Sequence, residues 1–143
     1  MEFNDNNVKH LEFIQSNIAR MNQCSFQMKG WMVAIVSALL ALYASSVDSI
    51  TGEGTKMYIF VAIAPTVIFW VLDSYYLQQE RKFRGVYNDL TDLEGRKGIK
   101  LFQMPLNKYK GCEYCIFNVM LSITEVLLYV PVIVGLIVAG VLL

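Results

Sequence analysis

Apolar positions along this 143-residue chain gather into three long runs, and the charged residues fall almost wholly between them. A helix rises about 1.5 Å per residue and needs about 20 residues to cross a hydrocarbon core of about 30 Å. Backbone groups in lipid must be paired within the segment, so isolated runs of this length are expected to be helical. The runs extend from Trp31 to Val47, from Met57 to Leu77 and from Ile116 to Leu143.

This pattern predicts an all-α, helical integral membrane protein. We expect one membrane domain over residues 1–143, with spans at about 31–47, 57–77 and 120–142. The first span, with 17 residues, is only just long enough. Three crossings leave about 70 residues outside lipid, which is too few for a separate soluble catalytic domain.

The segment before the first run has its own helical period. Apolar positions recur at steps of three and four residues from Asn7 to Met28, which predicts an N-terminal amphipathic helix. Gly30 would allow a bend before the span that opens with Trp31. The five residues from Thr51 to Thr55 include two glycines, and they predict a tight turn that makes the first two spans an antiparallel hairpin.

The second helix is expected to continue past the membrane. Residues 78–93 keep a helical apolar period and contain no proline, so the pattern predicts one long helix from Met57 to about Leu93. Glycines and Pro105 then break the pattern, and segment 95–111 is predicted to be an irregular loop with a short strand around Ile99 to Gln103.

Basic residues are unequally distributed between the spans. The first 30 residues hold three Lys or Arg, the hairpin connection holds one, and residues 78–115 hold eight. The positive-inside rule then places segments 1–29 and 78–115 in the cytoplasm and the hairpin turn and C-terminus outside. The equal totals of Lys+Arg and Asp+Glu, 12 each, make a direct nucleic-acid binder unexpected.

A few polar residues interrupt the spans at one depth. The helical rise puts Asp73 and Glu125 near the same inner boundary of the hydrocarbon, and acids there need a partner or water. One interpretation is structural: Asp73 bonds Tyr76 or a basic residue such as Lys29, and Glu125 marks the entry of the third helix. The other is a functional polar layer around an oligomer axis. Its candidate residues are Asp73, Glu125, Asn118, Ser122 and Tyr76.

Small residues on two spans would permit close helix contact. Ser37, Ala41 and Ser45 follow a four-residue spacing on the first span, and Gly135 with Ala139 repeats it on the third. The sequence therefore predicts a homo-oligomer in the lipid bilayer, unless packing within one chain uses these positions.

Recognisable enzyme and metal motifs are not found. Cys112 and Cys115 form a single CxxC, which supplies two of the four ligands of a structural zinc site. Small thiols packed at a helix entrance are the simpler interpretation. The chain has one histidine, His10, and no phosphate-binding glycine loop. We expect no enzymatic activity, no cofactor and no bound metal.

The central segment carries a distinctive order of residues, FWVLDSYYLQQERKFR, from Phe69 to Arg84. It resembles a family of small bacterial multi-pass membrane proteins and, more loosely, the SLATT-type two-span membrane effectors of antiphage defence systems. The likeness covers about residues 14–89, and the third span is an addition to the two-span plan. Carried over by position, the signature or partner-docking residues are Trp70, Glu80, Arg81 and Arg84.

This resemblance implies a location and a class of function. It implies the bacterial inner membrane, and a pore-forming or membrane-disrupting effector gated from the cytoplasm by a protein or a nucleotide messenger. Lys108 and Lys110 are candidate contacts for an anionic ligand. The alternative is a non-conducting membrane scaffold or accessory subunit that docks a cytoplasmic partner. The sequence specifies neither the activating signal, nor the stoichiometry, nor a conducted species.

Overall fold

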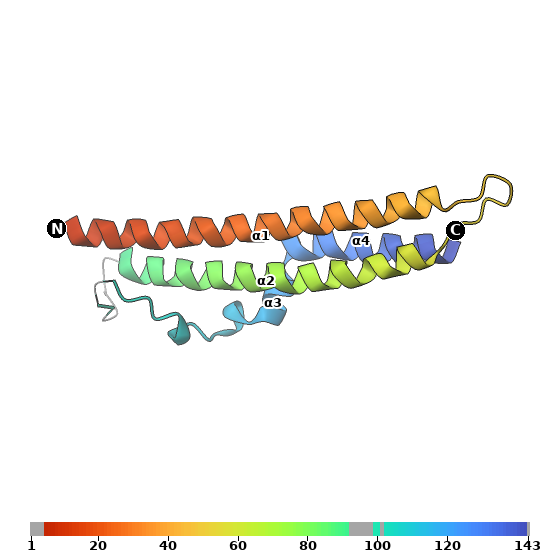
Figure 1. The fold of residues 1–143 in the computed structure, drawn as a ribbon. Helices are drawn as coiled ribbons and strands as arrows, with labels where there is room; N and C mark the ends of the chain where they lie inside the picture. The colour runs from red at the N-terminus through yellow and green to blue at the C-terminus, as the bar shows by residue number, and fades with distance from the viewer. Residues whose placement is uncertain (1–4, 92–98, 101, 143) are drawn as a thin grey trace.

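The computed structural model describes residues 5–91, 99–100 and 102–142. The described chain is helical, and none of it forms a strand. Figure 1 shows a long bundle in which two extended helices run side by side and a shorter third helix lies along one half of them. In chain order the elements are α1 (Asp5–Ser45), α2 (Met57–Thr91), the 3-10 turns η1 (Leu106–Lys108) and η2 (Cys112–Tyr114), α3 (Ile116–Met120) and α4 (Ile123–Leu142).

Three of these helices, α1, α2 and α4, are long and apolar enough to cross a membrane, as the three runs predicted. The second helix continues well past its apolar half, with 35 residues in all. We call the end of the bundle that holds Asp5 to Met28 of α1 and Gln78 to Thr91 of α2 the polar end. It projects beyond α4 (Figure 1).

The first helix is longer and simpler than expected. Its 41 residues run without a break through Gly30, where the sequence allowed a bend. A glycine inside a helix costs only about 1 kcal/mol relative to alanine, and the packing of α1 against α2 offsets that cost. The N-terminal segment and the first span are therefore one rod.

The third apolar run is not one helix, contrary to expectation. It divides into α3 and α4, with a break at Leu121 and Ser122. The Ser122 carbonyl accepts hydrogen bonds from the backbone N–H groups of Glu125 and Val126, both at 3.0 Å. Serine suits the start of a helix because its side chain competes with helical backbone bonding. The membrane-length helix accordingly begins at Ile123 rather than near residue 120.

The strand expected around Ile99 to Gln103 does not form in the described part of that segment. Instead the Gln103 N–H donates to the Lys100 carbonyl at 2.9 Å, which is a turn. Phe102 has a φ of 60°, a conformation that bulky residues rarely adopt. Residues 92–98 and Leu101 lie outside the described residues, so the loop predicted for 95–111 is seen only in part.

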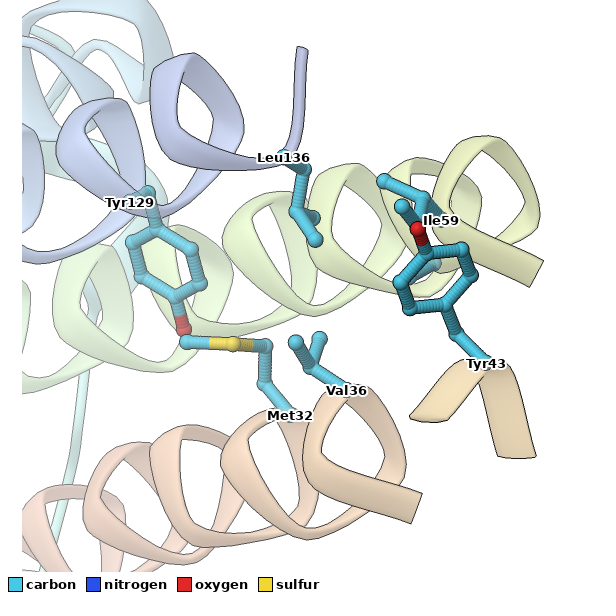
Figure 2. Close-up of a cluster of buried hydrophobic side chains, with 7 residues drawn as sticks. Met32, Val36, Tyr43, Ile59, Tyr129 and Leu136 are labelled. Atoms are coloured by element: carbon cyan, nitrogen blue, oxygen red, sulfur yellow. The ribbon is translucent and has the colours of Figure 1, made fainter. Parts of the chain in front are cut away.

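The core lies where the apolar halves of three helices meet, with α2 between the other two. Among the described residues, no Cα atom of α1 lies within 8 Å of one in α4, whereas α2 packs against both. The side chains must therefore bridge the outer helices. The buried cluster that does so is shown in Figure 2 and consists of Met32, Val36, Tyr43, Ile59, Ala62, Tyr129 and Leu136.

The hairpin turn between α1 and α2 is fixed by short-range hydrogen bonds. The Asp48 carboxylate accepts from the Ile50 N–H at 2.7 Å, and the Asp48 carbonyl accepts from the Gly52 N–H at 2.8 Å. Gly52 has a φ of 72°, in the left-handed region that a side chain disfavours. The turn thus depends on glycine at this position.

Two glycine substitutions should have opposite effects. Gly52→Ala should destabilise the protein by about 1–2 kcal/mol, because alanine must enter the left-handed region. Gly30→Ala should stabilise it by about 0.5–1 kcal/mol, because a Cβ there meets nothing within 4 Å and the position is helical. Unfolding of both variants in mild detergent, followed by circular dichroism, measures the difference. Equal shifts of the same sign would contradict the assigned backbone conformations.

Candidate functional site

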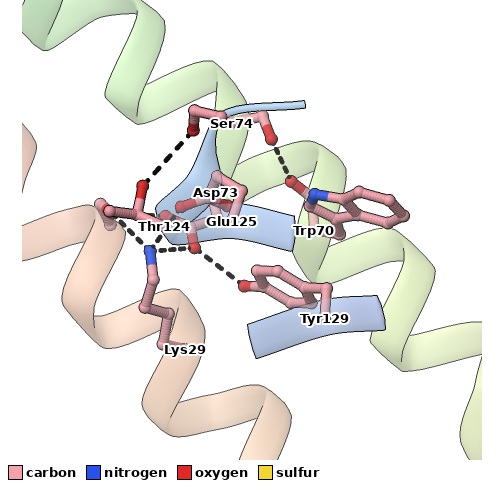
Figure 3. Close-up of polar contacts among 9 residues, drawn as sticks. Lys29, Trp70, Asp73, Ser74, Thr124, Glu125 and Tyr129 are labelled. Atoms are coloured by element: carbon pink, nitrogen blue, oxygen red, sulfur yellow. Dashed lines mark hydrogen bonds and ion pairs between the residues drawn. The ribbon is translucent and has the colours of Figure 1, made fainter. Parts of the chain in front are cut away.

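One buried group of polar side chains joins all three long helices. It comprises Ser25 and Lys29 of α1, Asp73 of α2, and Glu125 and Tyr129 of α4, and we call these five residues the charge cluster. Figure 3 shows Lys29 reaching between the carboxylates of the other two helices. The cluster lies where the apolar halves of the helices begin, at the edge of the polar end.

Lys29 is the centre of the cluster. Its Nζ donates to Glu125 Oε1 at 2.9 Å and to Ser25 Oγ at 3.2 Å. It also pairs directly with Asp73 Oδ2. One ammonium thus contacts both other helices, and its three donors are all used.

Asp73 accepts on both of its carboxylate oxygens. Ser25 donates to Oδ1, while Lys29 and the Tyr129 hydroxyl, the latter at 2.9 Å, donate to Oδ2. The carboxylate is completely buried. Three donors from two other helices therefore satisfy an acid that would be very unfavourable alone in an apolar environment.

Glu125 is also completely buried, but it is less well satisfied. Only its Oε1 is bonded, and Oε2 has no partner among the described residues. The Lys29 side chain, by contrast, is 25% exposed. The cluster thus contains two acids for one base, and the excess acid is on α4.

Helical periodicity places these groups together. Ser25 and Lys29 are four residues apart on α1, and Glu125 and Tyr129 are four apart on α4, so each pair shares a helix face. Asp73 lies on the central helix, between the two pairs. The Tyr129 ring also stacks on the indole of Trp70, with ring centroids 5.8 Å apart and an angle of 11° between the planes.

The residues proposed for the polar membrane layer divide into two groups. The structure brings Asp73 and Glu125 together inside one chain, through Lys29. Asn118 lies on α3 and donates to the Cys112 carbonyl at 2.7 Å, outside the cluster. The Tyr76 ring packs edge to face against Tyr75, and among the described residues its hydroxyl makes no hydrogen bond to Asp73. The break before α4 puts Asn118 and Glu125 on separate helices.

The signature residues of α2 differ in their burial and in their partners. Glu80 is buried and pairs with Arg84 one turn later, which is more than half exposed. The Trp70 Nε1 is buried without a partner among the described residues. Arg81 lines a surface hollow together with Arg84 and Glu113. Trp70 touches the charge cluster, and the others belong to the polar end.

The sequence predicted Lys29 as one possible partner of Asp73, whereas Ser25 was not among the candidate site residues. Ser25 could have been identified from its spacing of four residues to Lys29 at the depth of Asp73. Tyr129 shares a helix face with Glu125, but its bond to Asp73 depends on how α4 packs against α2. Tertiary packing decides which acid each donor reaches.

The polar end holds the other candidate group, Lys108 and Lys110. Both are exposed and flank Tyr109, whose hydroxyl donates to Asp89 Oδ2 at 2.8 Å. Burial, and then the bond and charge of Asp89, raise the pKa of Tyr109, so this phenol remains a neutral donor at pH 7.

The cysteines are free thiols, with Cys112 and Cys115 exposed and Cys24 half-buried. Within the described ranges, no three His, Cys, Asp or Glu side chains lie close enough to hold a metal ion. The polar chemistry of this chain is concentrated in the charge cluster and in the basic, aromatic surface of the polar end.

Comparison with known proteins gives no further assignment: no family model matches this chain, and no curated protein and no solved structure is significantly similar to it.

The two acids of the charge cluster should differ in their effect on stability. Asp73→Asn should cost about 3–5 kcal/mol, because it breaks a buried, fully hydrogen-bonded pair. Glu125→Gln should change stability by less than about 1 kcal/mol, because it removes the excess charge and leaves Lys29 paired with Asp73.

Thermal unfolding of the purified variants in one detergent measures the difference. Asp5→Asn is the control, since its pair with Lys9 is exposed and should shift stability by no more than about 0.5 kcal/mol. An equal cost for Asp73→Asn and Glu125→Gln would contradict the central position of Asp73.

Proposed function

We propose that this chain is a membrane effector that opens or disrupts the bilayer as a homo-oligomer and is gated from the cytoplasm. The observation that carries the proposal is the charge cluster. Ionisable groups inside membrane spans are expensive and usually functional, and here three of them from three helices converge at one depth. In this proposal the cluster is the latch of the closed state.

The position of Lys29 gives the latch a route to a signal. It lies on one unbroken helix, 24 residues from Asp5, so α1 extends about 36 Å past it into the polar end. A force on that end therefore moves the ammonium relative to Asp73 and Glu125. Because α1 and α4 share no close backbone contact, the Lys29 to Glu125 bond is their main polar link.

Assembly is needed for a pore, since Asp73 and Glu125 are buried within a single chain and three helices cannot enclose a water path. Ser37, Ala41 and Ser45 are exposed on α1 and leave that face open to a second copy. Gly140 differs: a Cβ there would lie 2.8 Å from the Phe60 ring, so α4 uses this glycine to pack against α2. The resemblance of residues 14–89 to SLATT-type effectors supports a role in bacterial antiphage defence.

A scaffold that docks a cytoplasmic partner is the second candidate. The paired polar halves of α1 and α2 favour it, because they form an elongated surface that includes exposed Phe13 and Phe26. A scaffold needs no latch, so the two candidates differ in whether the charge cluster controls flux.

Flux from liposomes tests the choice. Glu125→Gln should raise ion or dye leakage by up to about fivefold at unchanged oligomer size, because a loss of up to about 1 kcal/mol from the α1 to α4 link shifts the closed-to-open ratio by up to that factor. Lys9→Gln, at an exposed ion pair outside the cluster, is the control. A scaffold predicts no flux from any variant, and that result would remove the pore proposal.

Orientation can be tested separately with the native cysteines. We propose that the polar end faces the cytoplasm of the bacterial inner membrane, with the hairpin turn and C-terminus outside. An impermeant thiol reagent applied to intact cells should then miss exposed Cys112 and Cys115 but label Thr51→Cys in the exposed turn. Labelling of Cys112 without cell lysis would reverse the orientation.

A further inference from the structure

A pocket of about 550 Å³ lies at the polar end, between α2 and the segment that carries η1 and η2. In Figure 1 this segment runs alongside the polar half of α2. Its size falls in the range of small-molecule sites. We call it the α2 pocket, and its lining residues are Gly85, Asn88, Asp89, Ile99, Lys108, Tyr109, Lys110, Gly111 and Tyr114.

The wall of the pocket is closely packed. A Cβ on Gly85 would lie 2.8 Å from ring carbons of Tyr109 and from the Tyr114 hydroxyl, so only glycine admits these rings against the helix. The rings meet edge to face, with centroids 5.6 Å apart. Gln78 Nε2 donates to the Tyr114 carbonyl at 2.6 Å and holds the segment to α2.

The unpaired charge of the pocket is positive. Among the described residues, neither Lys108 nor Lys110 has a carboxylate within 4.0 Å, whereas Asp89 already accepts from Tyr109. An adjoining hollow of about 250 Å³ shares Gly85, Asn88 and Tyr114 with the pocket. It adds three charged residues, Arg81, Arg84 and Glu113. The described lining of the two hollows therefore carries four basic groups against two acidic ones.

We propose that the α2 pocket binds the phosphate group of a soluble small molecule. Two ammonium groups beside the neutral amide of Asn88 and the phenol of Tyr114 offer both the charge and the hydrogen-bond donors that a phosphate with about −1.5 to −2 charge needs. This inference rests on the proposed function, in which the polar end receives the signal, and it specifies the chemistry of that signal.

Phosphate can come from a lipid headgroup or from a dissolved molecule, and the depth of the pocket favours the second. Gly85 lies 12 residues beyond Asp73 on the continuous helix α2, which is about 18 Å. Headgroups extend only about 5–8 Å beyond the hydrocarbon on each side. The pocket therefore stands clear of the lipid if the charge cluster marks the inner boundary.

The same helix connects the pocket to the charge cluster. Asp73 and Gly85 lie on one uninterrupted stretch of α2, so a ligand that changes the contact between α2 and Tyr109 acts on the element that carries the latch. Phosphate binding would then bias the proposed gate without reaching the membrane.

The test is calorimetric titration of inorganic pyrophosphate into the full chain in nanodiscs of zwitterionic lipid. We expect saturable binding with one site per chain. Lys108→Gln with Lys110→Gln should weaken it at least tenfold. The matched control, Lys9→Gln with Lys82→Gln, removes the same charge from the same end without touching either hollow and should bind as the wild type does.

Three results would overturn the proposal. They are no saturable binding, an equal loss in both double variants, and pyrophosphate binding by the wild type that disappears in nanodiscs of anionic lipid. The last would assign the site to a lipid headgroup. Calorimetry measures binding and not flux, so the two proposals can fail separately. Pyrophosphate binding without a liposome leak would count against the pore but not against the pocket. A liposome leak without pyrophosphate binding would count against the pocket but not against the pore.

Discussion

The bond network of Lys29 is the interaction on which the rest of this structure depends. Burying one ammonium and two carboxylates is favourable only when they meet with good geometry, so their meeting fixes the depth of all three helices at once. Apolar side chains such as Met32 and Leu136 pack in the core beside the charge cluster, and their contacts are tolerant of small sliding movements of the helices. The charge cluster is not, since a shift of one helical residue would leave an acid buried without a donor.

The central position of α2 follows from the same constraint. This helix packs directly against both neighbours, while α1 and α4 meet through long side chains. Asp73 therefore takes donors from both sides, and Glu125 takes only the one that spans the gap. The less well satisfied of the two acids is therefore the one on α4.

The long helices also connect surfaces that are far apart. Helix α1 extends unbroken through the level of Lys29, and α2 through the levels of Asp73 and Gly85. A helix transmits displacement along its axis because each turn is bonded to the next. The polar end, with the α2 pocket, and the charge cluster are thus two parts of the same rigid elements, which is a suitable arrangement for a protein that responds to a dissolved signal at a membrane.

The sequence by itself determined the class of structure and the candidate acids. Apolar runs about as long as a bilayer crossing requires specify helices, and the helical period past Leu77 specifies the extended α2, because both depend on local backbone bonding. The break at Leu121 and Ser122 and the continuity through Gly30 were not foreseen, since single-residue propensities of about 1 kcal/mol are decided by packing.

Only the tertiary structure decided how the polar residues pair. Asp73, Glu125 and Lys29 are separated by at least 44 positions, and no local rule selects among their partners. Whether the acids faced one another, a second copy or a base depended on the rotation of each helix about its axis. The packing of α2 against both α1 and α4 sets that rotation, and it places the acids inside one chain, on either side of one lysine.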